Sequence, residues 1–491
     1  MNKKIKLGRG KQIYVINFFF AVLLCIIMAP MIYTIGYSIP HNDDYAMFIP
    51  SQNGTSTNIF IQAAILANKF WNNWSGDWSY TFLEYLLNPI TNFGISSIAF
   101  GIEMIIFFLF FVTSQGLLFQ AVFSRILKVS DSRIRWFCFL IFIGFFLNTR
   151  IYPQVFYWYV GASYMWGVTL CSLTMWLEVI YFTNGYKKIT AYILSVVGLV
   201  SCMNLLVPVV PGVFFIILIW INVKIKKQTF NGKHLLPLGA MVLGGVLALI
   251  APGNYMRKSG TTYSDYNFGK AIVDSCIDFA KLCKSLLINP FTIIYMIIFI
   301  VIGIKILKKV KYSFKYPIIP YILYGITMII TCFPVAFGYG VAMVPNRIHF
   351  VLHAYSYLLL LLCALYTGAW VYRKWGDEIK GCHLKYLCVI SLMFLYCAVI
   401  PTKYYNDLPF YVTVVQAKQI TQCSNEWRKI YKEVEQSKEE SIVIYADKIL
   451  CNVPMLLDPD KIEKEEEYLA TVGDSIARVC GKKSVEIIIS N

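Results

Sequence analysis

Two adjacent carboxylates are the first residues in the chain that could do chemistry. Asp43 and Asp44 follow a long uncharged apolar run and stand in the segment "YSIPHNDDYAMF". Neighbouring carboxylates can bind a divalent cation such as Mg²⁺ or Mn²⁺, or one can act as a general base while the other tunes its pKa. They can also serve structure, because Asn42 or Asp43 could cap a helix that begins near Tyr45. The pattern leaves these roles open.

Two later segments place cations where apolar runs end or begin. The segment "APGNYMRK" contains a proline and a glycine that break a helix, followed by Arg257 and Lys258. The segment "VPNRIHF", at the start of a later apolar run, contains Arg347 and His349. A guanidinium binds phosphate oxygens in pairs, so these residues are candidates for holding a phosphate or pyrophosphate. The alternative is that they pair with lipid headgroups or with acidic side chains.

Several other side chains suit the binding of a sugar. Tryptophan and tyrosine rings can stack on a sugar, but the same residues also form aromatic belts at a membrane surface. The candidates for substrate binding are His41, Trp74, Trp78, Tyr80, Trp158, Tyr164 and Asn254.

Composition shows which kind of protein must position these residues. Of the 491 residues, 58% are hydrophobic and 14% are charged, and the mean hydropathy is +0.60. A soluble protein carries nearly twice that charged fraction, and apolar runs of about twenty residues can each cross a bilayer as a helix. The sequence therefore predicts an all-α polytopic membrane protein.

The distribution of charge predicts the orientation of the chain. The net charge is +17, but 24 lysines and arginines gather in loops on one side of the predicted spans, and the loops on the other side hold 8 before the tail begins. The positive-inside rule then places the N-terminus in the cytoplasm, and the same distribution argues against a nucleic-acid partner. The fourteen cysteines form no CxxC pair and suit small buried apolar residues.

Eleven spans are expected, and Pro208 and Pro211 break the uncharged run 189–223 into a hairpin because it is too long for one crossing. Within the spans, Glu178 is expected to reach the cytoplasmic rim and Glu103 to face a cavity. The predicted spans are 13–36, 96–122, 136–150, 160–182, 189–205, 208–223, 235–251, 287–304, 317–336, 347–371 and 385–400.

The chain divides into a transmembrane domain, residues 1–400, and a small extracytoplasmic α/β tail, residues 401–491. Two long external loops, 37–95 and 252–286, contain apolar residues at helical spacing. They are expected to form interfacial helices with one face in lipid, or simply to brace the spans. In the tail, "SIVIYA" and "SVEIIIS" are typical of strands.

This order of motifs resembles the GT-C-type membrane glycosyltransferases. "NDDYAMF", "WSGDWSY", "FYWYVGASY" and "APGNYMR" look like the signatures of a bacterial branch of that class. The resemblance implies a GT-C-like fold, with Asp43 as general base or metal ligand, Asp44 supporting it and Arg257 holding the donor phosphate. One departure is Asp77, which stands where the branch has an arginine after the glycine of the first loop.

The resemblance further implies the reaction and its place. A sugar would move from a polyprenyl-phosphate donor to a glycan, cell-wall polymer or lipid acceptor outside a bacterial cytoplasmic membrane. Because nucleotide sugars are absent there, the donor must arrive on a lipid, and direct displacement assisted by one base inverts the anomeric carbon. A polysaccharide polymerase or ligase on a similar scaffold is one alternative, and a transporter or flippase of lipid-linked sugars is another.

Overall fold

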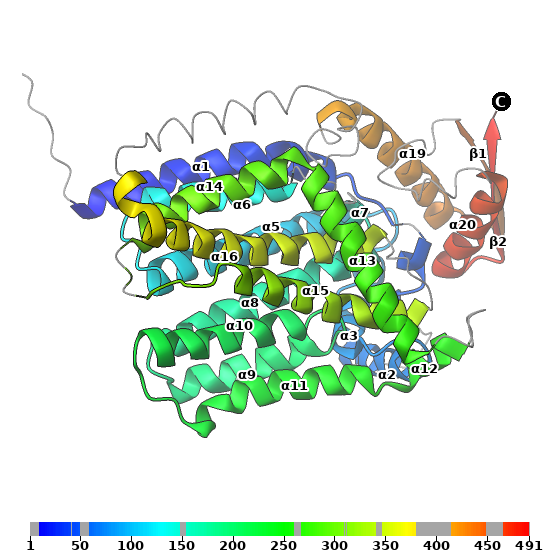
Figure 1. Ribbon diagram of the computed structural model, residues 1–491. Helices are drawn as coiled ribbons and strands as arrows, with labels where there is room; N and C mark the ends of the chain where they lie inside the picture. The colour runs from blue at the N-terminus through cyan, green and yellow to red at the C-terminus, as the bar shows by residue number, and fades with distance from the viewer. Residues whose placement is uncertain are drawn as a thin grey trace, which may run out of the picture.

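Long apolar runs form the long helices of the computed structural model, which lie side by side in a bundle (Figure 1). The structure describes residues 9–40, 42–49, 58–147, 154–259, 267–308, 310, 312–339, 346–379, 414–447 and 465–490. The principal helices of the bundle are α1 (Arg9–Ile35), α5 (Ala99–Ala121), α6 (Ser132–Leu147), α8 (Tyr159–Thr183), α9 (Lys188–Cys202), α10 (Val209–Trp220), α11 (Leu236–Leu249), α14 (Pro290–Leu307), α15 (Ile318–Tyr339) and α16 (Asn346–Ile379).

Shorter elements connect or extend these helices. They are η1 (Asn42–Tyr45), α2 (Ile59–Asn73), α3 (Trp78–Leu86), α4 (Pro89–Phe93), η2 (Val122–Ile126), α7 (Gln154–Tyr157), η3 (Ile221–Ile225), η4 (Gly232–Leu235), α12 (Pro252–Ser259) and α13 (Phe268–Ile288).

Among the described residues, six helical segments are long and apolar enough to cross a membrane, or seven if α13 and the apolar part of α14 count as one span bent by 79°. The run 189–223 is broken as expected into the shorter apolar helices α9 and α10, with Pro208 as the residue that precedes α10, and both helices pack against α8. The chain is therefore a helical polytopic membrane protein. The predicted span 385–400 lies outside the described residues.

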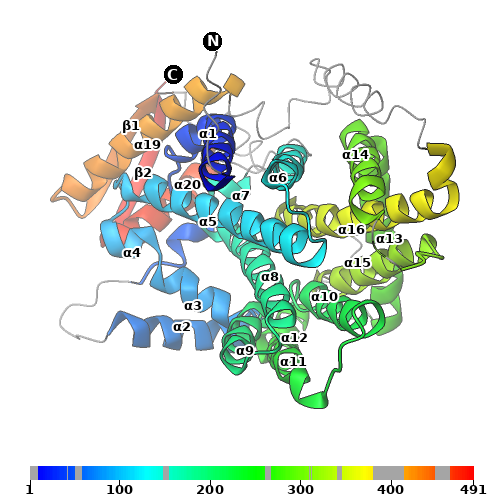
Figure 2. The same cartoon turned by 90° about the vertical axis from the view of Figure 1, so that its left-hand side faces the viewer.

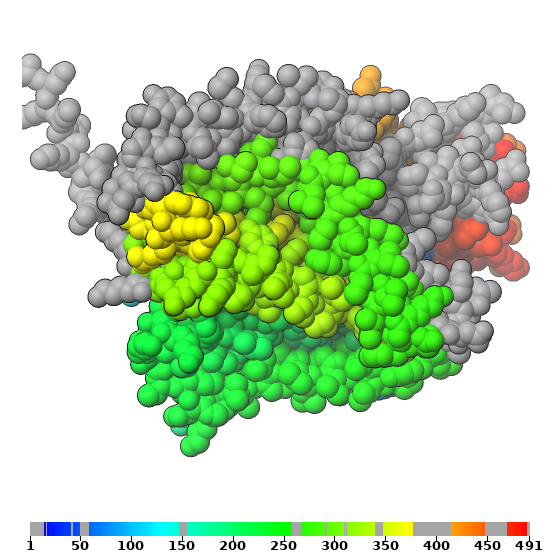
Figure 3. Space-filling view, viewed as in Figure 1, coloured from blue at the N-terminus to red at the C-terminus, as the bar shows by residue number. Residues whose placement is uncertain are grey.

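Helix α8 is the centre of the bundle. It packs against α5, α9, α10 and α16, and Figure 2 shows these helices arranged around it. The bundle's outward faces carry apolar side chains, as a lipid environment requires. In Figure 3 the side chains of α11 and α13–α15 cover much of one face. The exposed apolar residues of these helices include Leu243, Ile272, Ile322 and Ile326.

Of the two expectations about acidic residues in the spans, the one for Glu178 is wrong and the one for Glu103 stays a prediction. Glu178 does not reach a rim: its side chain is fully buried in α8, and neither carboxylate oxygen has a hydrogen-bond partner among the described residues. The side chain is enclosed because α8 is covered by helices on several sides. Glu103 is half-buried on α5.

The second long loop contains the expected amphipathic helix, α13. In its first half the apolar residues Phe268, Ile272 and Cys276 are exposed, whereas Asp274 and Asp278 are buried against the protein. The second half of the predicted apolar stripe turns inward, and Leu286 is buried. The orientation of the first half suits a helix that lies along the membrane surface with its apolar face in lipid.

The C-terminal unit, defined here as residues 414–447 and 465–490, lies at one end of the bundle (Figure 1). It contains α19 (Ala417–Gln436), β1 (Ser441–Asp447), α20 (Glu465–Cys480) and β2 (Ser484–Ser490). The two strands pair in parallel, with Ser441 opposite Ser484, and α20 packs on β2.

Candidate functional site

The acidic pair lies in η1, at the same end of the bundle as the C-terminal unit. Backbone amides of Ala46 and Met47 donate to the carbonyl oxygen of Asp43 at 2.9 and 3.2 Å. This tight turn separates the two acidic side chains: Asp43 is exposed, and Asp44 is fully buried. The pair therefore does not present two neighbouring carboxylates to one ligand.

The buried carboxylate of Asp44 binds the start of α8. Its Oδ1 accepts a hydrogen bond of 2.9 Å from the backbone amide of Val160, in the first turn of that helix. Helix starts carry unpaired amides and partial positive charge, so a carboxylate stabilises them. The expected helix beginning near Tyr45 is absent from the described chain, where η1 ends at that residue. Asp44 instead acts as a cap for a helix more than a hundred residues away.

Arg347 also lies beside the first turns of α8. Its Nε donates to the hydroxyl of Tyr164 at 3.1 Å, and its guanidinium carbon lies 5.5 Å from the centre of the Trp158 ring. Two predicted sugar-binding aromatics and a predicted phosphate-binding cation thus lie together. His349, two residues further along α16, accepts at its backbone carbonyl from Nδ1 of His353 at 2.8 Å.

Glu84, on α3, belongs to the same region and was not predicted. It is buried, and burial raises its pKa to about 8, with the negative charges of Asp77, Asp44 and Asp43 adding to the rise and a hydrogen bond with Ser163 of α8 opposing it. Three aspartates from different segments thus lie within electrostatic reach of Glu84. The sequence signal was a lone acid among apolar residues in "TFLEYLL".

A second junction joins the first external loop to α12. The side chain of Asn254 accepts from the amide of Gly76 at 3.0 Å and donates to the carbonyl of Ala248 at 2.8 Å. A Cβ atom on Gly76 would lie 2.0 Å from that same carbonyl oxygen, and one on Gly253 would lie 2.4 Å from the amide nitrogen of Trp74. Asn254, predicted to bind substrate, thus uses its amide group to join two loops.

Asp77 and Arg257 lie at this second junction. The Ser75 hydroxyl donates to Oδ2 of Asp77 at 2.6 Å. Burial raises the pKa of Asp77, while the Ser75 hydrogen bond and the positive charge of Arg257 act in the lowering direction. The Arg257 guanidinium carbon also lies 4.8 Å from the centre of the half-exposed Trp74 ring. Asp77, which departs from the motif pattern of the resemblance, therefore lies near Arg257, a residue predicted to bind phosphate.

The remaining predicted residues have other surroundings. Tyr80 is buried, and its hydroxyl donates to the carbonyl of Ser201 at 3.0 Å, so it packs α3 on α9 and cannot line an open site. The Trp78 ring stacks on Phe82 with ring centres 5.4 Å apart. Lys258 is described only as part of α12, and His41 lies outside the described residues.

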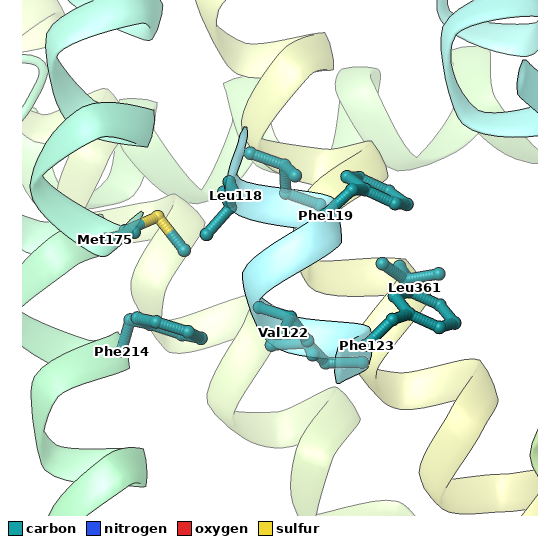
Figure 4. Close-up of a pocket in the computed structure, with 9 residues that line it drawn as sticks. Leu118, Phe119, Val122, Phe123, Met175, Phe214 and Leu361 are labelled. Atoms are coloured by element: carbon teal, nitrogen blue, oxygen red, sulfur yellow. The ribbon is translucent and has the colours of Figure 1, made fainter. Parts of the chain in front are cut away.

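An apolar pocket lies deeper in the bundle, away from these groups (Figure 4). Its lining contains no polar side chain and no predicted site residue, so it offers no acid–base chemistry. The lining residues, from α5, η2, α8, α10 and α16, are Leu118, Phe119, Val122, Phe123, Met175, Phe214, Leu358, Leu361 and Leu362.

The predicted metal ligands do not form a ligand set. In the part of the chain that the structure describes, no group of three or more His, Cys, Asp or Glu side chains is arranged to hold a metal ion. Asp44 directs one oxygen to an amide and Asp43 is exposed, so these two residues alone do not supply the several oxygens that Mg²⁺ requires.

Comparison of the chain with protein-family models, with curated proteins and with solved structures finds no match.

Proposed function

We propose that this protein is a membrane glycosyltransferase that moves a sugar from a polyprenyl-phosphate donor to an acceptor outside the cytoplasmic membrane. One observation supports this most strongly: acids and cations from distant segments lie together at one end of an apolar bundle. Asp44 and Arg347 contact the first turns of α8. The negative charges of Asp43 and Asp77 help to raise the pKa of Glu84.

The two aspartates have different roles in the transfer step. Asp43, whose side chain is exposed, accepts the proton of an acceptor hydroxyl as that oxygen attacks the anomeric carbon. The bond from that carbon to the phosphate oxygen breaks, its electron pair stays on the lipid phosphate, and the anomeric configuration inverts. Asp44, bound to α8, fixes the position of the turn. Arg347 and Arg257 stabilise the charge that grows on the departing phosphate.

The proposal includes the full topology of eleven spans, with a cytoplasmic N-terminus and the C-terminal unit outside. Support comes from the ends of the helices: the basic loops after α5, α8, α10 and α14 lie at the end of the bundle opposite the C-terminal unit (Figure 1). The eleventh span of this proposal, 385–400, lies between α16 and α19 and outside the described residues.

The test is donor turnover by purified protein in lipid nanodiscs, with a polyprenyl-phosphate sugar and a panel of glycan and lipid acceptors. We expect Asp43→Asn to lower turnover by about a hundredfold or more, the usual contribution of a general base. Asp474→Asn on α20, another exposed aspartate near the same end, is the matched control. Unchanged turnover in Asp43→Asn would remove this residue from the mechanism. A parallel assay with a pyrophosphate-linked glycan as the donor distinguishes this activity from that of a polymerase or ligase.

A transporter of lipid-linked sugars is the second candidate, and Glu178 favours it. A fully buried acid without a hydrogen-bond partner among the described residues is costly inside a membrane, and such groups often mark transport pathways. If this alternative holds, liposomes will show movement of intact donor between leaflets without cleavage. Glu178→Gln will then abolish that movement, and Asp43→Asn will not.

A further inference from the structure

One face of α19 contacts the segments that surround the acidic turn. Arg428, Tyr431 and Glu435 are spaced by three and four residues, so they lie on the same side of the helix. Each binds a backbone segment of the transmembrane region more than three hundred residues away in the chain.

Tyr431 makes the contact nearest to the aspartates. Its hydroxyl donates to the carbonyl oxygen of Pro40 at 2.7 Å and lies 2.8 Å from the hydroxyl of Tyr45. The Tyr45 hydroxyl lies 2.9 Å from the same carbonyl. All three groups are buried. In the sequence, Pro40 precedes the two aspartates and Tyr45 follows them. This triangle of oxygens therefore ties both ends of the acidic turn to α19.

The other two side chains bind the neighbouring helix ends. Arg428 donates to the carbonyl of Gly36 at 3.3 Å, just after the end of α1, where carbonyl groups lack helical partners. Glu435 accepts from the amide of Ile95 at 2.8 Å and also binds the amide and hydroxyl of Ser96, shortly before α5 begins. The C-terminal unit thus binds the chain just after α1, which precedes the acidic turn, and just before α5.

The acidic turn is consequently held from two sides. Asp44 joins it to α8 within the bundle, and Tyr431 joins it to the C-terminal unit, whose α20 also packs against η1. Because η1 has only four residues, its own hydrogen bonds fix few backbone dihedrals, and these outside contacts set its position.

We propose that Tyr431 is a positioning residue, through which the C-terminal unit holds the Asp43–Asp44 turn in the geometry required for transfer. The inference rests on the proposed function for its consequence in catalysis, but its structural part can be tested separately. Small displacements of a reacting group lower rates strongly, because they lose the near-attack geometry.

The structural part is tested by hydrogen–deuterium exchange of the whole protein in nanodiscs. The amides of Tyr37, Ser38, Ala46 and Met47 all donate hydrogen bonds near the turn, so a peptide covering residues 36–49 reports on it. We expect exchange in this peptide to be about fivefold faster in Tyr431→Phe, since each lost hydrogen bond contributes roughly 1 kcal/mol. The control is Tyr445→Phe on β1, where the side chain is 72% exposed and exchange should match the wild type.

The catalytic part is tested by kinetics on the same samples. We expect Tyr431→Phe to lower kcat about tenfold with little change in the KM for donor, because the phosphate-binding arginines are untouched. The double variant Tyr45→Phe/Tyr431→Phe should lose less kcat than the product of the fold losses in the two single variants, as expected for groups in one hydrogen-bond network.

Each outcome decides the inference. Wild-type exchange in Tyr431→Phe would overturn it, as would faster exchange with unchanged kcat while Asp43→Asn is inactive. If the wild type transfers no sugar, the proposed function fails, and the exchange result still decides whether Tyr431 holds the turn.

Discussion

Two junctions at the same end of the molecule join distant segments by different means. At the first turn of α8, Asp44 reaches Val160 through a buried carboxylate, 116 residues apart in the chain. At the start of α12, Asn254 reaches Gly76 across 178 residues, and glycines let the two backbones approach closely. A buried carboxylate forms the first junction. The second combines an asparagine side chain with glycines whose lack of a side chain lets the backbones come close.

The difference affects the two candidate phosphate ligands. Arg347, at the first junction, contacts a tyrosine hydroxyl and a tryptophan ring. Arg257, at the second, lies near the carboxylate of Asp77 as well as the Trp74 ring. Both junctions therefore have a buried carboxyl nearby whose pKa is raised, whereas a change in side-chain volume at a glycine should affect the second.

Adding a methyl group at the second junction should give the largest effect. In Gly253→Ala the new Cβ would lie 2.4 and 2.7 Å from the backbone nitrogens of Trp74 and Ser75, so backbone must move. We expect the free energy of unfolding in detergent to fall by about 3 kcal/mol. Gly239→Ala on α11 has no neighbouring atom within 4 Å and should be neutral or slightly stabilising. Equal stability of the two variants would refute the close approach.

The pH dependence of stability should come next. Because burial raises the pKa of Glu84 from 4.5 to about 8, folding favours its protonated form. Its stabilising contribution is complete below about pH 4.5 and is lost as pH rises towards 8. Between pH 6 and 8 we expect the wild type to lose about 2 kcal/mol of unfolding free energy through this residue.

Glu84→Gln cannot titrate, so its unfolding free energy should fall much less over the same interval. Glu486→Gln, an exposed residue of β2, should keep the wild-type slope. Parallel curves for the wild type and Glu84→Gln would show that Glu84 is not protonated on folding.

Local patterns in the sequence predicted the helices well, because apolar runs and helix-breaking prolines act over short distances. The helix break at Pro208 and the exposed apolar residues in the first half of α13 are examples. The strands of the C-terminal unit likewise follow short β-branched runs, as the pairing of 441–447 with 484–490 shows.

The contacts of the candidate site were harder to predict, because they depend on which distant segments pack together. No local signal distinguishes the buried Asp44 from the exposed Asp43, since the difference arises from the amide of Val160. The burial of Tyr80 and Glu178 similarly depends on neighbouring helices. The catalytic and ligand-binding roles of the site residues stay predictions.

The smallest expected effect separates the two neighbouring aspartates. Asp44→Asn keeps an oxygen that can accept from Val160 but removes the negative charge from the start of α8, which should lower the unfolding free energy by about 1 kcal/mol. Asp43→Asn changes an exposed side chain and should stay within about 0.5 kcal/mol of the wild type. Denaturant titration in detergent measures both values. If stability and turnover fell together in Asp43→Asn, its loss of activity would reflect folding, and the division of labour between the two acids would be wrong.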